Sequence, residues 1–311
     1  MTTEKNLTVF DIIIVNYNTT DYLSRCLRSV YDSLDSLPAM IFVQDNGSVD
    51  NVERVTSLFP EVILSRNATN IGYSKAVNNA LRVSSASYVV LLNPDSYVMQ
   101  GFFENALHHM KENSQVGILG PKILNSDGSV QGSARSFPSP ITGLFGRNTL
   151  LTKLLPNNRF SRQNVITKRS DGITPIEVDW VSGACMVVRK AAIDDVGPLD
   201  ERFFLYWEDA DWCRRMWGSG WKVVYYPQAA VMHYVGGSSE KLPLRSTVEF
   251  HKSAYRLFAK EARGAKRFAK PLAMWALGLR FLLSFSWYAL NHWSGRARGH
   301  TQLKDSPPTD A

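Results

Sequence analysis

The sequence predicts an α/β protein in which helices flank a mostly parallel sheet. Over the first 95 residues, short apolar, β-branched runs alternate with segments of helical periodicity, as in βαβ units. Hydrophobic residues make up 44% of the 311 residues, which is enough to bury a large core without disulfides. Polar clusters (VNYN, QDNGS and LNPDS) directly follow three of the apolar runs. Such sheets bind ligands at the carboxyl ends of their strands, so chemistry is expected at these clusters.

Four strands and two helices are expected in this part of the chain. The first helix should cover residues 20–37, because leucines and a valine recur at i, i+4, i+7 and i+11 starting at Leu23. The second helix should cover residues 72–83. The strands are expected at residues 9–15, 40–43, 61–65 and 88–92.

The rest of the chain falls into three parts. Residues 125–177 are rich in Gly, Ser, Pro and Asn, which predicts long loops with short elements between them. Regular structure should resume over 178–189 and continue through the aromatic segment 203–221. An amphipathic helix is expected over 246–262. We therefore predict a globular domain over residues 1–245 and a basic, apolar, helical region over 246–311.

The positive charge is confined to the C-terminal fifth. Residues 1–244 hold 23 Lys and Arg against 24 Asp and Glu, whereas residues 245–311 hold 12 against 4. A basic cluster at 263–270 precedes residues 272–290, a Trp-bearing segment in which Arg280 is the single charge. This composition is typical of a membrane surface and favours a membrane partner over nucleic acid. A full span is disfavoured because Arg280 lies mid-segment; a helical hairpin packed on the body is the alternative.

The three cysteines are scattered, which argues against a disulfide framework and a zinc ribbon. The N-terminus lacks the features of a secretory signal. We expect a cytoplasmic protein that is peripheral on the inner face of the cell membrane.

Three strand-end motifs contain candidate ligand-binding residues. Asp45, in DNGS, can accept hydrogen bonds from a nucleobase or ribose, although an ordinary Asx turn explains it equally well. Gly72 opens a helix where backbone amides can approach a phosphate, or it simply begins the helix. Asp95, after Asn93-Pro94, can hold a divalent cation together with substrate phosphates, or lie in a solvated turn.

Two later motifs add a candidate base and a candidate metal ligand. Glu208, Asp209 and Asp211 follow five large apolar or aromatic residues, which raise the pKa of a carboxylate toward that of a general base. The alternative is an acidic helix N-terminus that begins near Glu208. His233 precedes a Gly-Gly-Ser loop, so it is either a structural residue or a ligand near phosphates.

The order of the motifs resembles glycosyltransferase family 2, whose members are inverting enzymes of the GT-A fold with a Rossmann-like sheet. IVNYN, DNGS-x-D, N-x-GY, NPD, WVSGA, FFLYWEDAD and HYVGGS occur in that order over about residues 9–240. Within the family, the chain is similar to bacterial rhamnosyltransferases of cell-wall linker and O-antigen synthesis. The resemblance makes residues 1–245 the catalytic domain.

The resemblance also implies a role for each matching position. Asp209 is the expected catalytic base, with Glu208 beside it and Asp211 as the second candidate. Asp95 is the expected metal ligand, completed by the diphosphate and His233, because Asn93 replaces the first Asp of the family's D-x-D. The expected nucleotide-sugar-binding residues are Asn16, Asn18 and Asp45 near the base and ribose, Gly72, Asn78 and Asn93 around the sugar nucleotide, Trp180, Gly183 and Ala184 at the donor–acceptor junction, and Arg215 orienting carboxylates or phosphates.

The implied reaction is a single displacement assisted by Mg²⁺ or Mn²⁺. The expected donor is dTDP-L-rhamnose, and the expected acceptor is a polyprenyl-diphosphate-linked saccharide at the cytoplasmic leaflet. A UDP- or GDP-sugar donor, and a non-catalytic nucleotide-sugar-binding module, stay open as alternatives. A dehydrogenase is disfavoured because VNYNTTDY, after the first strand, contains no glycine.

Overall fold

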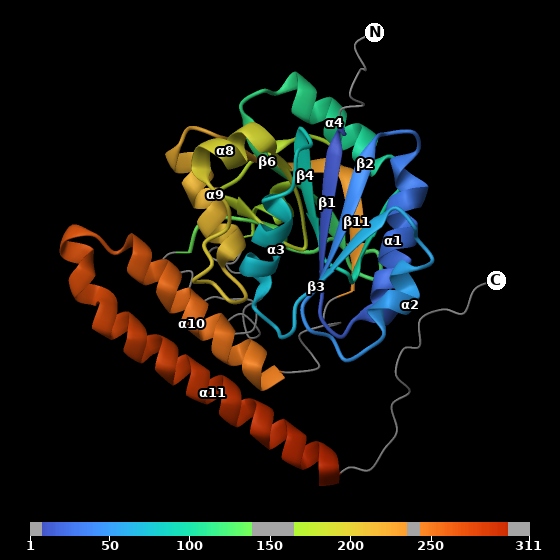
Figure 1. Cartoon of the computed structure of the whole chain (residues 1–311). Helices are drawn as coiled ribbons and strands as arrows, with labels where there is room; N and C mark the ends of the chain where they lie inside the picture. The colour runs from blue at the N-terminus through green and yellow to red at the C-terminus, as the bar shows by residue number, and fades with distance from the viewer. Residues whose placement is uncertain (1–7, 139–164, 235–242, 298–311) are drawn as a thin grey trace. The chain divides into compact units, whose positions relative to one another are not determined.

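The computed structural model describes residues 8–138, 165–234 and 243–297. The chain divides into two compact units, Met1–Pro243 and Leu244–Ala311. Within the described residues, the first unit contains a nine-stranded sheet in the order β3-β2-β1-β4-β10-β6-β11-β5, with β8 paired to β11 (Figure 1). Its strands are β1 (Phe10–Asn16), β2 (Ala39–Asp45), β3 (Val62–Arg66), β4 (Tyr88–Leu92), β5 (Ser96–Val98), β6 (Val116–Leu124), β8 (Ile176–Glu177), β10 (Cys185–Arg189) and β11 (Lys222–His233).

Helices cover both faces of this sheet (Figure 1). They are α1 (Thr20–Leu34), α2 (Val52–Thr56), α3 (Tyr73–Leu81), α4 (Phe102–Glu112), α8 (Lys190–Val196) and α9 (Glu208–Gly218). A separate two-stranded ribbon pairs β7 (Ala134–Arg135) with β9 (Trp180–Val181), and a short 3₁₀ helix covers Ile166–Arg169. The α/β class predicted from the sequence is confirmed.

The central strands are buried on both faces, which explains their nearly continuous apolar sequences. Every residue of β1 is buried. Phe10, Ile12 and Ile14 pack in one core cluster with residues of α1 and α4. Ile13 and Val15 pack in a second cluster with residues of α3, α8 and α9. This alternation follows from the two-residue period of a strand, which sends successive side chains to opposite faces.

The sheet is parallel in its first half and mixed in its second. β1 pairs in parallel with β2 and β4, and β2 pairs in parallel with β3. β10 is antiparallel to both β4 and β6. Because β10 runs in the opposite direction, its first residue Cys185 lies opposite Leu92, the last residue of β4. The segment that leads into β10 therefore arrives at the edge where β1, β2 and β4 end.

Most predicted elements of the first half are found, with shifts at their ends. The strand expected at 88–92 has those bounds in the structure. The helix expected to reach residue 37 ends at Leu34, because Asp35 has a φ of 51° and breaks the helical path. The helix expected over 72–83 covers Tyr73–Leu81, with Gly72 as its N-cap. Of the predicted loop region 125–177, residues 139–164 lie outside the described residues.

In the part that the structure describes, the second unit is helical. α10 (Pro243–Glu261) and α11 (Lys270–Ala297) are joined through a 3₁₀ helix, Gly264–Ala269. The guanidinium carbon of Arg280 lies 5.7 Å from the ring centre of Phe250, and the ring centres of His251 and Phe281 are also 5.7 Å apart. α10 and α11 therefore contact each other along a stripe that includes the single charge of the apolar segment.

Candidate active site

The turn after β2 is held by a buried network around Asp45. Asn16 Nδ2 donates to Asp45 Oδ1 at 3.0 Å and to Ser48 Oγ at 3.1 Å. Asp45 Oδ2 accepts from the Ser48 amide and from Arg66 Nε, each at 3.2 Å. Asp45 is fully buried. Both carboxylate oxygens are thus engaged within the protein, so a contact with a base would need their remaining lone pairs or a movement of Arg66.

Asn18 links the ends of β1 and β2 through the same turn. Its backbone amide donates to Ser48 Oγ at 2.9 Å, and its side-chain Oδ1 accepts from the Val49 amide at 2.8 Å. Its φ of 56° is left-handed, a conformation that asparagine tolerates better than most residues. The three residues expected near the nucleotide base, Asn16, Asn18 and Asp45, therefore form one hydrogen-bonded unit.

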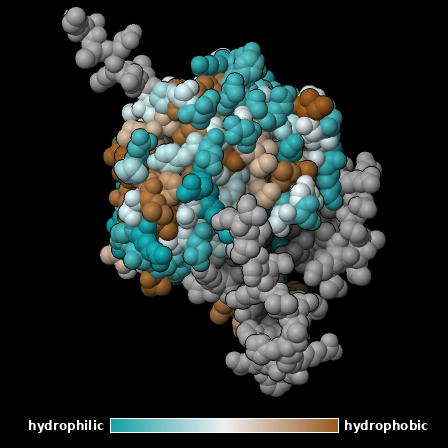
Figure 2. All heavy atoms as spheres, turned by 90° about the vertical axis from the view of Figure 1, so that its right-hand side faces the viewer, coloured by the Kyte–Doolittle hydropathy of each residue, from teal (hydrophilic) through white to brown (hydrophobic). Residues whose placement is uncertain are grey.

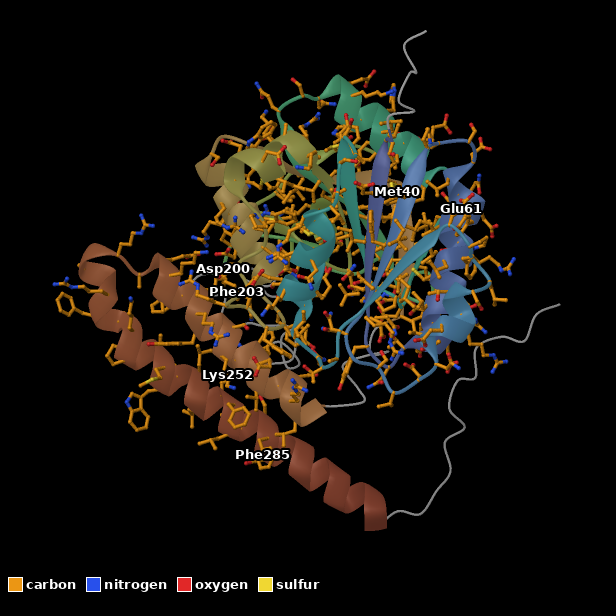
Figure 3. The ribbon with its side chains drawn as sticks, viewed as in Figure 1. Met40, Glu61, Asp200, Phe203, Lys252 and Phe285 are labelled. Carbon is orange, nitrogen blue, oxygen red and sulfur yellow. The ribbon has the colours of Figure 1, made fainter. Side chains whose placement is uncertain are left out.

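Gly72 brings the N-x-GY motif against the FFLYWEDAD motif. It has a φ of 92°, and a Cβ at this position would lie 2.8 Å from the backbone oxygen of Phe204. The next amide, that of Tyr73, donates to the same oxygen at 2.7 Å. Only glycine combines this conformation with such a close backbone approach. Phe203, labelled in Figure 3, is buried in the segment that is held in this way.

Asp209 lies in the first turn of α9 and is held by two backbone amides. Its Oδ2 accepts from Gly183 at 2.9 Å, and its Oδ1 accepts from Ala210 at 2.7 Å. Burial raises the pKa of Asp209, while these two amides and the positive charge of Arg135 oppose that rise. An acid stabilised in its ionised form by fixed donors suits a general base.

Glu208 is the buried neighbour of this carboxylate. Burial, and then the negative charge of Asp209, raise the pKa of Glu208 well above its ordinary value. Its Oε2 is buried without a hydrogen-bond partner among the described residues. Because two adjacent carboxylates do not readily ionise together, and Asp209 has the better donors, Asp209 ionises first and Glu208 holds the proton.

Asp95 and His233 lie together at the same edge of the sheet. Asp95 Oδ1 is 3.3 Å from His233 Nε2, and the two side chains are only 7% and 15% exposed. Ser96, the first residue of β5, pairs in register with His233, the last residue of β11, which explains the approach. Gln131 Oε1 is 3.3 Å from His233 Nδ1, while Gln131 Nε2 donates to the His233 carbonyl at 2.8 Å.

Asn93 connects this pair to the candidate base, Asp209. Its amide donates to the Ala184 carbonyl at 3.0 Å, and the neighbouring residue Gly183 donates to Asp209. Two hydrogen bonds to adjacent residues therefore join the loop that carries Asp95 to the carboxylate of Asp209. The residues expected at the metal, at the junction and at the base converge, although they come from distant parts of the sequence.

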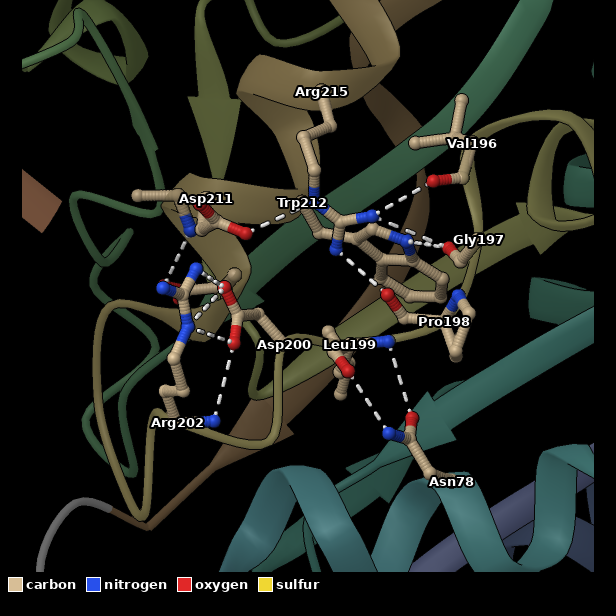
Figure 4. Close-up of polar contacts among 12 residues, drawn as sticks. Asn78, Val196, Gly197, Pro198, Leu199, Asp200, Arg202, Asp211, Trp212 and Arg215 are labelled. Carbon is tan, nitrogen blue, oxygen red and sulfur yellow. Dashed lines mark hydrogen bonds and ion pairs between the residues drawn. The ribbon is translucent and has the colours of Figure 1, made fainter. Parts of the chain in front are cut away.

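Asn78, Asp211 and Arg215 each contact other groups of the first unit (Figure 4). Asn78 Nδ2 donates to the Leu199 carbonyl at 2.9 Å and Asn78 Oδ1 accepts from the Leu199 amide at 3.1 Å. Asp211 is buried and pairs with Arg215 Nε at 3.0 Å. Arg215 also donates to the carbonyls of residues 196–198.

These contacts give the three expected site residues partners within the protein. Asn78 supports the loop between α8 and α9, and its role in shaping the sugar-nucleotide site stays a prediction. Arg215 orients the Asp211 carboxylate, one of the two alternatives expected for it, and also holds the same loop. Asp211 is engaged in this ion pair, so Asp209 stays the first candidate for the base.

Sequence reasoning missed Arg135 as a site residue. It belongs to the Gly- and Ser-rich stretch predicted as loops, where a single basic residue has no periodicity that would single it out. In the structure it pairs in register with Trp180 across the β7–β9 ribbon. Trp180 itself donates from Nε1 to the Ser136 carbonyl at 3.0 Å, and its ring centre is 6.1 Å from that of Trp207.

A surface cavity lies at the other end of the strands. His109, Glu177 and Lys222 are among the residues that line it, together with the first residue of β6. Since β6 and β11 begin there, whereas the polar clusters lie where parallel strands end, this cavity is separate from the candidate active site.

The comparisons with known proteins agree with this geometry. Residues 11–197 match the family model of glycosyl transferase family 2. N-acetylglucosaminyl-diphospho-decaprenol L-rhamnosyltransferase of Mycobacterium tuberculosis is 32% identical over 270 residues, which are 82% of this chain and 86% of the relative. Rhamnosyltransferase WbbL of Escherichia coli is 21% identical over 260 residues, which are 80% of this chain and 92% of the relative.

Solved structures show the same fold. The mannosyltransferase PcManGT from Pyrobaculum calidifontis, in complex with GDP-Man and Mn²⁺, matches with a TM-score of 0.57 at 15% identity, covering 94% of this chain and 81% of that one. GalNAc-T7, with UDP, GalNAc and Mn²⁺, matches with a TM-score of 0.59 at 14% identity, and the match covers 85% of this chain and 50% of that one. The predicted GT-A fold is confirmed by these likenesses. On the family model and the mycobacterial relative together, the chain belongs to glycosyltransferase family 2.

Proposed function

We propose that the protein is an inverting, metal-dependent rhamnosyltransferase. It transfers L-rhamnose from dTDP-L-rhamnose to a hydroxyl of a polyprenyl-diphosphate-linked saccharide in cell-envelope polysaccharide synthesis. The observation that carries the proposal is the pair of hydrogen bonds through Gly183 and Ala184, which fixes Asp209 relative to the loop that holds Asp95. The similarity to the mycobacterial rhamnosyltransferase supports the choice of sugar and acceptor class.

The chemistry follows from the state of the two acids. Asp209, ionised and held by the amides of Gly183 and Ala210, removes the proton from the acceptor hydroxyl. The acceptor oxygen then attacks the anomeric carbon from the face opposite the nucleotide, and the nucleoside diphosphate leaves. A single displacement of this kind inverts the anomeric configuration and needs no second nucleophile.

The donor set of Asp95 and His233 fits a divalent cation. Gln131 Nε2 donates to a backbone carbonyl, so its Oε1 is the acceptor and His233 Nδ1 must donate to it. When His233 is neutral, its Nε2 lone pair then faces the Asp95 carboxylate oxygen, which is repulsive unless a cation or a proton lies between them. Such a second contact on the far ring nitrogen is typical of metal-ligating histidines.

Asp95 and His233 would thus hold Mg²⁺ or Mn²⁺ together with oxygens of the donor diphosphate. Within the described residues, no cluster of three or more acidic, His or Cys side chains offers a complete metal site. When bound, the cation neutralises the charge that develops on the leaving diphosphate. The Mn²⁺ in the two solved relatives supports this assignment.

The second unit supports a peripheral membrane position on the cytoplasmic side. The segment Arg267–Ser286 is long and apolar enough to cross a membrane, and none of it is buried. Its large exposed apolar side chains are Phe268, Leu272, Met274, Trp275, Leu279, Leu282, Leu283 and Phe285. By contrast, on the face of the first unit that carries α1 and α2, apolar residues are dispersed among polar ones (Figure 2).

The exposed residues surround α11 on several sides, so an apolar medium fits them better than a single partner helix. Arg280 is the exception and lies over the Phe250 ring of α10. This contact shields the charge on the side that α10 covers. We infer that the apolar sides of α11 insert among lipids while the basic residues before it meet anionic headgroups.

A transfer assay tests the proposed function. The purified chain is incubated with Mn²⁺, radiolabelled dTDP-L-rhamnose and polyprenyl-diphosphate-linked N-acetylglucosamine, and label is followed into the lipid phase. We expect transfer that disappears when Asp209 is replaced by Asn, with donor binding retained. Transfer only from a UDP- or GDP-sugar would replace the proposed donor. Donor binding without transfer to any acceptor would instead indicate a non-catalytic binding module.

A further inference from the structure

Two tryptophans lie side by side next to the proposed base. The ring centres of Trp180 and Trp207 are 6.1 Å apart and their planes are inclined by 43°. Trp207 immediately precedes Glu208 and Asp209, and Trp180 lies three residues before Gly183, which holds Asp209. Both indoles are partly exposed. Trp207 is thus two residues from Asp209 in the chain, whereas Trp180 is linked to it through the Gly183 hydrogen bond, and each indole presents part of its surface to solvent.

The backbone that presents Trp207 is strained. Tyr206 and Trp207 have φ values of 68° and 70°, so two successive bulky residues adopt the left-handed region. Such a conformation is unfavourable for bulky residues and persists where surrounding structure enforces it, often at functional sites. Here the hydrogen bond from Tyr73 to the Phe204 carbonyl fixes the preceding segment. The strained backbone thus places Trp207 at the N-cap of α9, directly before Glu208 and Asp209.

A cation lies on the other side of the pair. The guanidinium carbon of Arg135 is 5.6 Å from the ring centre of Trp180, and Arg135 Nε donates to the Gly132 carbonyl at 2.8 Å. Arg135 is also close enough to Asp209 for its charge to act on that carboxylate. The cluster thus combines an aromatic surface, a fixed positive charge and a base. Aromatic faces stack on the apolar face of a pyranose ring, and guanidinium groups pair with phosphates.

We propose that Trp180, Trp207 and Arg135 form the acceptor subsite, which takes a glycosyl diphosphate. The two indoles hold the acceptor sugar with its hydroxyl at Asp209, and Arg135 contacts the diphosphate attached to that sugar. This inference rests on the proposed transferase function and adds to it the residues that choose the acceptor. The inference predicts that substitutions of the two indoles weaken binding of the sugar, whereas substitutions of Arg135 weaken recognition of the diphosphate.

Binding measurements test the subsite without turnover. A water-soluble, short-chain N-acetylglucosaminyl diphosphate lipid is titrated by calorimetry into the full-length Asp209→Asn protein, with and without a second substitution. We expect Trp207→Ala and Trp180→Ala each to weaken acceptor binding by about tenfold or more, with the affinity for the donor unchanged. The control is Trp217→Phe. Trp217 is a partly buried residue of α9, and its Nε1 donates to the Val178 carbonyl.

Arg135 is tested by acceptor chemistry. Arg135→Gln should remove the preference for the glycosyl diphosphate over an octyl glycoside of the same sugar, and Arg135→Lys should restore part of it. The subsite is disproved if the Trp variants bind the diphosphate acceptor as tightly as the Asp209→Asn parent does, or if they weaken only the binding of the donor. An equal loss on both acceptors would assign Arg135 to positioning Asp209 instead. If the parent binds acceptor but no variant with Asp209 intact transfers sugar, the proposed function fails while the subsite stands.

Discussion

The backbone amide of Gly183 donates a 2.9 Å hydrogen bond to Oδ2 of Asp209. A Cβ on residue 183 would lie 3.4 Å from the Asp209 Cβ, which is an ordinary van der Waals contact, so residue 183 packs closely against the side chain that its amide holds. Asparagine at position 209 keeps one side-chain oxygen, which can accept from the Gly183 amide, while its NH₂ group cannot accept from the Ala210 amide. The amide substitution therefore removes the candidate base and one of its two amide hydrogen bonds.

Replacing Asp209 by Asn should lower kcat by about 10²–10⁴-fold, which is the usual contribution of a general base. The affinity for the nucleotide sugar, measured by calorimetry, should stay within about twofold. A variant that keeps wild-type turnover would remove Asp209 from the mechanism.

Replacing Glu208 by Gln should leave turnover within a few-fold of wild type, because burial and the charge of Asp209 raise the pKa of Glu208 and so favour its neutral form, which Gln imitates. The matched comparison is Asp209→Asn, which is expected to be nearly inactive. Comparable losses in the two variants would mean that Glu208 also works in its ionised form.

The same raised pKa predicts how stability depends on pH. Protonated Glu208 contributes fully to the free energy of unfolding below its unfolded pKa of about 4.3. This contribution is lost as pH rises through its raised folded pKa. Urea unfolding at about pH 5 and pH 8 should show a steeper loss of stability for wild type than for Glu208→Gln. Parallel curves for the two proteins would contradict the buried neutral acid.

Replacing Gly72 by Ala should destabilise the fold by about 1–3 kcal/mol, because φ is 92° and the new Cβ would meet the Phe204 carbonyl oxygen at 2.8 Å. Turnover should fall as well, since the displaced segment carries the acids of α9. Thermal unfolding measures the first effect. Gly218→Ala is the control, because a Cβ there has nothing within 4 Å.

Replacing Asp95 by Asn or His233 by Ala should weaken Mn²⁺ binding in the presence of a nucleoside diphosphate by about 10–100-fold. Electron paramagnetic resonance of free Mn²⁺ reports the affinity directly. His108→Ala is the control, because this exposed side chain pairs with Glu112 on α4. Equal Mn²⁺ affinities in all of these proteins would exclude the site.

Ending the chain at residue 245 should release it from anionic liposomes while nucleotide binding persists. In the full chain, charging the exposed face with Trp275→Asp and Leu279→Asp should weaken liposome binding by at least about tenfold. Leu58→Asp, an exposed apolar residue of the first unit, is the matched control. Continued sedimentation of the shortened chain with liposomes would overturn the proposed role of the second unit.

Local sequence patterns were enough for the first half of the sheet. β4 could be predicted to the residue because its continuous apolar run, which is typical of a strand buried on both faces, is bounded by polar residues on both sides. The end of α1 was missed because Leu37 continues the apolar pattern past Asp35, whose backbone conformation the pattern does not encode. The mixed pairing of β10 likewise depends on partners that lie far away in the sequence.

The site was harder to predict than the fold, because its contacts are long-range. Asn78 has the residue type of a ligand-binding amide, yet it bonds to Leu199, 121 positions away. Arg215 was expected to orient carboxylates or phosphates, and it pairs with the carboxylate of Asp211. Arg135 gave no signal, since a lone basic residue in a loop-like stretch is common. Motif order placed the acids correctly in one region but could not give their hydrogen-bond partners.

The reversed direction of β10 has a consequence for folding. Cys185 meets Leu92 across a separation of more than ninety residues, and the amide that orients Asp209 lies just before that meeting point. Closing such a long connection is entropically slow and belongs to the late, non-local part of chain assembly. A chain in which β10 does not pair with β4 would contain every acidic residue of the first half, yet the Gly183 amide would not be in place to hold Asp209. The proposed catalytic site is therefore complete only once β10 has joined the sheet.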